Sequence, residues 1–391
     1  MRFEEAVALA GGAADEELIE DCLTPDGAYA VGDTLQIVGG VMRSMLRRTS
    51  VQDAIHLVIT NSPSLRCGVT FLDDRRAAVF IPLGALGRAR VLARRLLWHL
   101  HEDKPIIHVM GSAMDTRDFP WEVAPDLAVI FGEDVEDDPG YWDRLSEFDR
   151  RTPGNRRREA VANDVTCHCL LFLALHELAH VTAGHDRLAH LAGAGDPRTR
   201  PDLDQTRLRR GMEVHADVLA GQNFARILLV HPDWARLAVK RPDVVFGRSG
   251  FATAMLFGMY DTHRKTVYEY DTGIYPHPII RYEFSYEGLQ LVLEEQRYKR
   301  RQRAEQCSWS GWKDCIIAFN AMEWACLEGK YGSPPAGTQG GTGRYVPLTA
   351  LKYGAASALR PRMEEDSRLA QEIERIVEEL GDAGAGGTSS E

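Results

Sequence analysis

The sequence predicts an α+β protein in which a mainly helical region follows an N-terminal region of mixed strands and helices. Short β-branched and apolar runs alternate with a helical run over 1–154, whereas apolar residues recur at helical spacing over 155–332. Of the 391 residues, 44% are hydrophobic and 26% are charged, which is typical of a folded globular protein. A chain of this length forms about two or three domains or one large elaborated one.

The N-terminal region, 1–154, contains one expected helix, Arg88–His101, and three expected strands. The strands are Ile55–Thr60, Cys67–Leu72 and Ala77–Pro82. Acidic residues around a Pro-Gly pair at 133–144 and a basic cluster at 156–158 indicate a solvated connection, so we place a domain boundary near residue 154. The region has no recognisable motif, and its role stays open.

The region 155–332 is expected to be mostly helical, with a linker and a further helix after it. Its long apolar-periodic segments are 159–184, 207–229, 251–260 and 313–328. A Gly/Pro-rich linker at 333–348 precedes a helical segment at 349–382, in which an amphipathic helix over 363–380 starts at Pro361. Small and polar residues predict a disordered tail at 383–391.

Charge and apolar runs argue against several classes of protein. The net charge of −11 argues against a dedicated nucleic-acid binder. The amino terminus is acidic where a secretory signal is basic, and the longest strongly apolar run, Cys169–Leu175, is far short of the ~20 residues that span a bilayer. We therefore expect a cytoplasmic protein without a membrane span. The seven cysteines form no CxxC pair and indicate buried thiols.

The most specific motif is HELAH at 176–180, an HExxH sequence within an apolar helical run. Four residues make just over one helical turn, so His176 and His180 leave the same face and can hold one ion. Glu177 projects about 100° around the helix, toward the water of a catalytic zinc site. Gly184 is placed to end the helix. The alternative, in which these groups are hydrogen-bonded interior residues, is costly without a partner such as a metal.

A catalytic zinc ion held by two histidines needs a third protein ligand and an open position. Residues 213–217 read EVHAD, and Glu213 and Asp217 share one helix face at i and i+4. We assign Glu213 as the third ligand and Asp217 as the carboxylate that accepts the other ring N–H of a ligand histidine. Two alternatives stay open, namely a solvated acidic helix face and a ligand role for His185 or His215.

Three motifs together resemble those of known zinc peptidases. HELAHVTAGH at 176–185, ExxAD at 213–217, and His277-Pro278 followed by Arg281 look like the motif trio of HtpX-like and CAAX-type gluzincin metallopeptidases. The first two motifs are also similar to the Lit phage-exclusion peptidase and, more loosely, to ImmA/IrrE-type regulatory proteases. The resemblance implies a zincin-like catalytic domain at 155–332. HtpX-like enzymes are membrane proteins, however, and their arginine usually lies further from the His-Pro pair.

The resemblance also implies roles for residues near the His-Pro pair. His277 would donate to the oxyanion of the tetrahedral intermediate, and Arg281 would anchor the cleft through a carboxylate. Tyr275 belongs to a group of tyrosines of which one lines the cleft, the alternative being aromatic residues of the core. A surface His-Pro turn and an ordinary salt bridge are the alternatives for His277 and Arg281.

The expected function is that of a soluble zinc endopeptidase with one Zn²⁺ per chain, acting on an intracellular protein or peptide. A metal-activated water attacks the peptide bond, and Glu177 acts as general base and then as general acid. A regulatory or phage-defence protease is favoured by the similarity to Lit. The alternatives are a catalytically inactive zinc-binding regulatory or interaction protein, against which Glu177 argues, and a zinc hydrolase with another substrate. The cleavage site and oligomeric state stay open.

Overall fold

The computed structural model describes residues 2–15, 19, 31–40, 55–72, 76–98, 140–150, 156–196, 199, 204–231, 242–260, 273–276, 278–300 and 356–385. Within them the protein is mostly helical with a small three-stranded sheet, which confirms a mainly helical α+β fold. The strands are β1 (Ile55–Thr60), β2 (Gly68–Phe71) and β3 (Ala77–Pro82). The helices are α1 (Phe3–Leu9), α3 (Leu83–Trp98), α5 (Tyr141–Arg150), α6 (Arg156–Thr182), α7 (His185–Gly193), α8 (Gln205–Val230), α10 (Pro242–Tyr260), α12 (Pro278–Arg300) and α15 (Ala356–Ala385).

The sheet has the strand order β1-β3-β2, with β3 parallel to β1 and antiparallel to β2. All six residues of the central strand β3 are buried, as its uninterrupted apolar sequence suggests. The three expected strands are confirmed to within one residue. Helix α3 begins directly after β3, five residues before its predicted start at Arg88, because Gly84 donates to the carbonyl of Ser62 and so ties the first turn to the β1–β2 connection.

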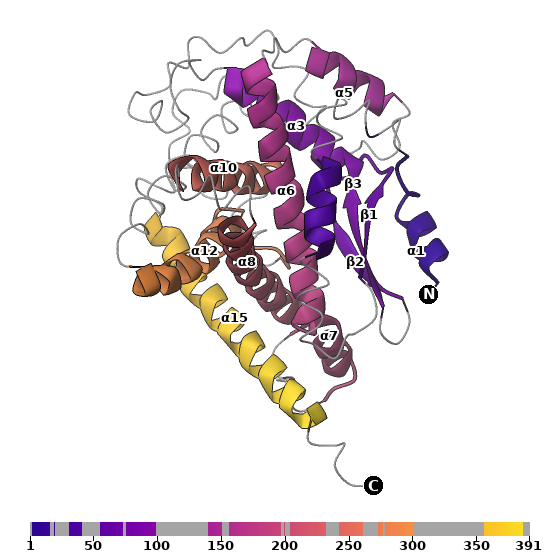
Figure 1. The fold of residues 1–391 in the computed structure, drawn as a ribbon. Helices are drawn as coiled ribbons and strands as arrows, with labels where there is room; N and C mark the ends of the chain where they lie inside the picture. Colours follow the sequence, from indigo (N-terminus) through magenta and orange to yellow (C-terminus); the bar gives the residue numbers. More distant parts are fainter. Residues whose placement is uncertain are drawn as a thin grey trace, which may run out of the picture.

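Helix α6 runs through the middle of the protein, with the sheet on one side and α8 on the other (Figure 1). It is buried on nearly all sides from Val165 onward, which explains its almost continuous apolar sequence. One hydrophobic core includes Val79 and Leu86 from the N-terminal region and Leu170 and Leu175 from α6. The core therefore crosses the expected boundary near residue 154, and the division into domains stays a prediction.

By length and composition, α6 could also cross a membrane: within Glu159–Thr182, an 18-residue window has a mean hydropathy of 1.3. The protein itself buries 89% of this window. Core helices of soluble proteins have the same length and composition. The cytoplasmic localisation stays a prediction.

Helices α8 and α12 approach each other closely at two glycines. A Cβ on Gly221 of α8 would lie 1.9 Å from the backbone oxygen of Ser285, and a Cβ on Gly288 of α12 would lie 2.1 Å from that of Val218. Both distances are far below van der Waals contact, so any larger residue would separate the two backbones. Helix α12 was not among the helices predicted from the sequence, and this contact sets its distance from α8.

We expect Gly288→Ala to destabilise the fold, because its methyl group meets backbone rather than a movable side chain. Overpacking costs about 1–3 kcal/mol, and backbone contacts lie at the upper end. The free energy of unfolding in urea measures the effect. Gly193→Ala in α7 is the matched control, since nothing lies within 4 Å of its added Cβ. Equal stability of the two variants would contradict this close packing.

Helix α15 lies along α8 (Figure 1). Its apolar residues Ile373, Ile376 and Leu380 share a core cluster with Leu208 and Met212 of α8. A buried ion pair joins the same two helices: Nε of Arg210 is 2.5 Å from Oδ1 of Asp366, and Nη2 is 2.8 Å from Oδ2. The C-terminal helix thus supports the turn of α8 that precedes Glu213.

Several expectations differ from the structure or lie outside the described residues. The amphipathic helix at 363–380 is confirmed, but the predicted start at Pro361 is wrong, because α15 begins at Ala356 and contains that proline. Pro361 lies in the second turn of α15, where it removes one backbone hydrogen bond and crowds the carbonyl of the residue four positions earlier. The expected 251–260 helix is the second half of α10. Outside the described residues lie the expected helix at 313–328, the linker at 333–348 and residues 386–391 of the expected disordered tail. The first three residues of that tail, 383–385, are helical and belong to α15.

Candidate metal centre

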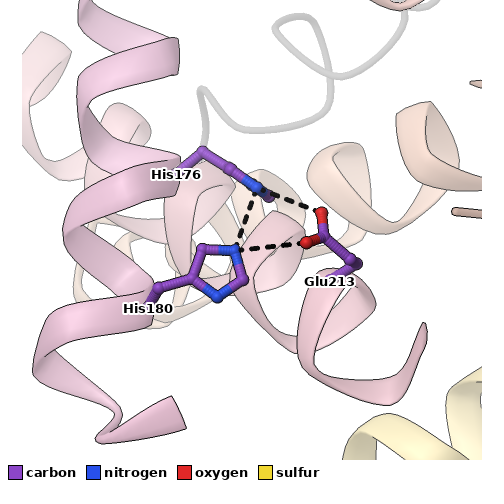
Figure 2. A group of neighbouring side chains, drawn as sticks. All are labelled: His176, His180 and Glu213. Atoms are coloured by element: carbon purple, nitrogen blue, oxygen red, sulfur yellow. Dashed lines mark hydrogen bonds and ion pairs between the residues drawn. The ribbon is translucent and has the colours of Figure 1, made fainter. Parts of the chain in front are cut away.

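The two histidines of the HExxH motif and a glutamate of α8 point toward one another (Figure 2). The Nε2 atoms of His176 and His180 are 3.2 Å apart. Oε2 of Glu213 is 3.4 Å from Nε2 of His176, and Oε1 is 3.7 Å from Nε2 of His180. Among the described residues, this group has three members that offer donor atoms within 4.8 Å of one another.

The spacing of this group is compatible with a metal ion. Bonds of about 2.0–2.1 Å at tetrahedral angles place neighbouring donor atoms roughly 3.3–3.4 Å apart. The separation of 3.2 Å between the two Nε2 atoms and that of 3.4 Å between Nε2 of His176 and Oε2 of Glu213 lie close to this value, while the 3.7 Å contact of His180 is with the other oxygen, Oε1. Two imidazole nitrogens with one carboxylate oxygen are also a donor set of catalytic zinc sites, which leave one position to water or substrate.

Asp217, one turn beyond Glu213, connects His176 to Arg281. Its Oδ1 lies 3.0 Å from Nδ1 of His176, the ring nitrogen opposite the donor. Nε of Arg281 donates to Oδ2 at 2.8 Å, and Nη2 donates to Oδ1 at 3.0 Å. Asp217 is completely buried, so the alternative of a solvated acidic helix face is wrong. Its position is the one that the sequence predicts for the carboxylate that orients a ligand histidine.

Arg281 reaches the centre from α12. Its Nη2 lies 3.3 Å from Oε2 of Glu213 and 3.4 Å from Nε2 of His176. Its pairing with Asp217 holds the guanidinium beside the donor group.

The charges at the centre favour a divalent cation. Glu177 and Asp217 are buried, and Glu213 has a side chain that is only 16% exposed. Arg281 supplies one positive charge beside these three carboxylates, and His176, whose pKa is raised to about 10, supplies a second when no ion is bound. Buried carboxylates are costly without compensating charge, and a divalent ion in place of the His176 proton would add one more positive charge.

The pKa values of the side chains reflect this concentration of charge. Burial raises the pKa of Glu177 to about 7, and the nearby charge of Glu213 acts in the same direction. Burial lowers the pKa of His180 to about 4, so this imidazole is neutral and ready to bind a metal. Burial opposes the charged form of His176, but Asp217 outweighs it and raises the pKa to about 10. A bound ion takes the place of that proton.

A row of buried histidines extends from His180 away from the donor group. Nδ1 of His180 lies 2.8 Å from Nδ1 of His185, and Nε2 of His185 lies 3.1 Å from Nδ1 of His215. His185 and His215 are only 3% and 7% exposed. Neither belongs to the three-donor group, so the structure places them behind a ligand rather than in a ligand position.

The two remaining predicted site residues are Tyr275 and His277. The Arg281 guanidinium carbon lies 5.6 Å from the ring centre of Tyr275, which is 52% exposed, so Tyr275 lies at the rim of the centre and not in the core. His277 lies outside the described residues. Tyr260, not predicted as a site residue, donates from Oη to the carbonyl of Leu65 at 3.1 Å. Its pKa is raised, mainly by burial and partly by the charge of Glu177.

Comparison of the chain with known protein families, with curated proteins and with solved structures finds no match.

Proposed function

We propose that this protein is a zinc-dependent peptidase of the gluzincin type, with a zincin-like catalytic domain. The observation that carries the proposal is the convergence of His176, His180 and Glu213 from two helices, with a buried Glu177 beside them. A closed structural zinc site has four protein ligands and needs no general base. Three donors and an adjacent carboxylate are what metal-assisted hydrolysis requires.

The chain's own side chains would divide the work of hydrolysis. When bound, Zn²⁺ supplies a Lewis acid and lowers the pKa of water toward ~7. Glu177 takes the proton from the attacking water and delivers it to the leaving amine. Asp217 holds His176 through Nδ1, and Arg281 fixes Asp217 and Glu213.

The sheet favours a peptide over other substrates. Strand β2 pairs with β3 on one side, and no described strand pairs with its other edge. An extended peptide can add to such an edge through backbone hydrogen bonds. Cys67, directly before β2, has a pKa raised mainly by burial and also by the charge of Glu177. The resemblance of the motifs to gluzincin peptidases supports the same substrate class.

The proposal is tested by mapping new protein amino termini in lysates exposed to the zinc-loaded protein. We expect a small set of cleavage sites that is absent after chelation and absent with Glu177→Gln. A narrow set would favour a regulatory protease. A zinc-loaded protein that produces no new amino termini would leave the alternative of a zinc-binding regulatory protein.

A further inference from the structure

We propose that His185 is a positioning residue that orients the ligand histidine His180 through a hydrogen bond between their Nδ1 atoms. The inference rests on the proposed zinc site. His176 has the carboxylate of Asp217 behind it, whereas the described structure places an imidazole behind His180. The identity of this partner determines how His180 presents Nε2 to the ion.

The direction of each hydrogen bond follows from the fact that a neutral imidazole carries a proton on only one of its two nitrogens. His180 faces the donor group with Nε2, so a neutral ring that binds an ion carries its proton on Nδ1. That N–H points to Nδ1 of His185 at 2.8 Å, which must then be the unprotonated nitrogen of His185. His185 therefore carries its proton on Nε2 and donates to Nδ1 of His215 at 3.1 Å. One metal ligand sets the tautomers of all three rings.

The backbone explains how His185 reaches this position. Residues five apart on a continuous helix are about 140° apart around its axis and do not face each other. Helix α6 ends at Thr182, and Gly184 has a φ of +67°, the left-handed conformation that glycine adopts readily. The chain turns there, and His185 begins α7 with its ring against that of His180.

The group that lies behind each ligand histidine affects how much positive charge remains on a bound ion. A carboxylate behind a ligand histidine raises the basicity of the ligand. Asp217 does this for His176, but a neutral imidazole behind His180 fixes the ring without adding negative charge. With Zn²⁺ bound, these partners would orient both histidines while leaving more positive charge on the ion, which would favour its action as a Lewis acid.

Two substitutions separate hydrogen bonding from packing. The amide oxygen of His185→Asn lies where Nδ1 was and can accept from His180, whereas the amide of His185→Gln reaches the former Nε2 position and can only serve His215. We expect His185→Asn to keep zinc affinity near the wild-type value and His185→Gln to weaken it by about 10- to 100-fold. A purely packing role predicts the opposite order, since Gln is closer to His in size.

Zinc affinity is measured by competition with a chromophoric chelator, after circular dichroism has shown that each variant is folded. His190→Gln is the matched control, since His190 is an exposed histidine on the same helix. Equal affinities of the Asn and Gln variants, in a wild type that binds zinc, would overturn the role of His185 alone. A wild type that binds no zinc would instead overturn the proposed function.

A measurement on the wild-type protein tests the inference even when the variants do not fold. In zinc-loaded protein labelled with ¹⁵N-histidine, long-range ¹H–¹⁵N correlation spectra report the tautomer of each ring. We expect the proton of His180 on Nδ1 and that of His185 on Nε2. A proton on Nδ1 of His185 would overturn the inference, because that nitrogen could then not accept from His180.

Discussion

Glu177→Gln is expected to keep zinc and to lower the rate of peptide hydrolysis by about 10²–10⁴-fold. Glutamine has nearly the same shape as glutamate but cannot take a proton from water. Glu177 is not one of the three donors, so the metal ligands stay in place. The rate is measured on a peptide that contains a cleavage site identified in lysates, and the zinc content by mass spectrometry.

Glu374→Gln is the control for this substitution, because it makes the same chemical change at an exposed position of α15. We expect it to leave both the rate and the zinc content unchanged. A Glu177→Gln protein that cleaves at the wild-type rate would refute the assigned general base. Loss of zinc in that variant would show that Glu177 holds the centre together rather than acting on water.

Removal of zinc is expected to lower the melting temperature substantially. A ligand that binds only the folded state stabilises it by about 4 kcal/mol at a thousand times its dissociation constant. Without the ion, Glu213 and Asp217 keep Arg281 and a protonated His176 as cations, so the centre has one positive charge fewer than with the ion bound. Protein purified without added zinc should contain one zinc per chain, and a chelator should remove it together with this stabilisation.

His180→Ala and Glu213→Ala are expected to abolish both the zinc content and the response of the melting temperature to chelator. His190→Ala is the control, because this exposed histidine lies on α7 outside the three-donor group. Mass spectrometry gives the zinc content and calorimetry the melting temperature. If the wild type takes up no zinc even on titration, the helices do not hold an ion and the peptidase proposal must be abandoned.

The sequence by itself determined the local features of the fold and of the metal centre. The three strands, helix α6 and helix α8 follow from hydrophobic periodicity, and each differs from its prediction by at most three residues. The convergence of His176 and His180 follows from the pitch of one helix. The end of that helix near Gly184 is local too, because it depends on backbone conformation at a single residue.

Only the tertiary structure decided which distant residues meet. Helix α12 was not predicted. Its distance from α8 depends on Gly221 and Gly288, and only the packed structure shows that these glycines lie where the two backbones meet.

The row from His180 through His185 to His215 likewise joins residues of three helices. The HExxH motif at 176–180 and the ExxAD pattern at 213–217 indicated the three metal donors. No sequence pattern indicated a hydrogen-bond partner for His185 or His215. Periodicity reports which face of a segment is buried, but the contacts that orient ligands arise from packing between segments, and no local pattern specifies them.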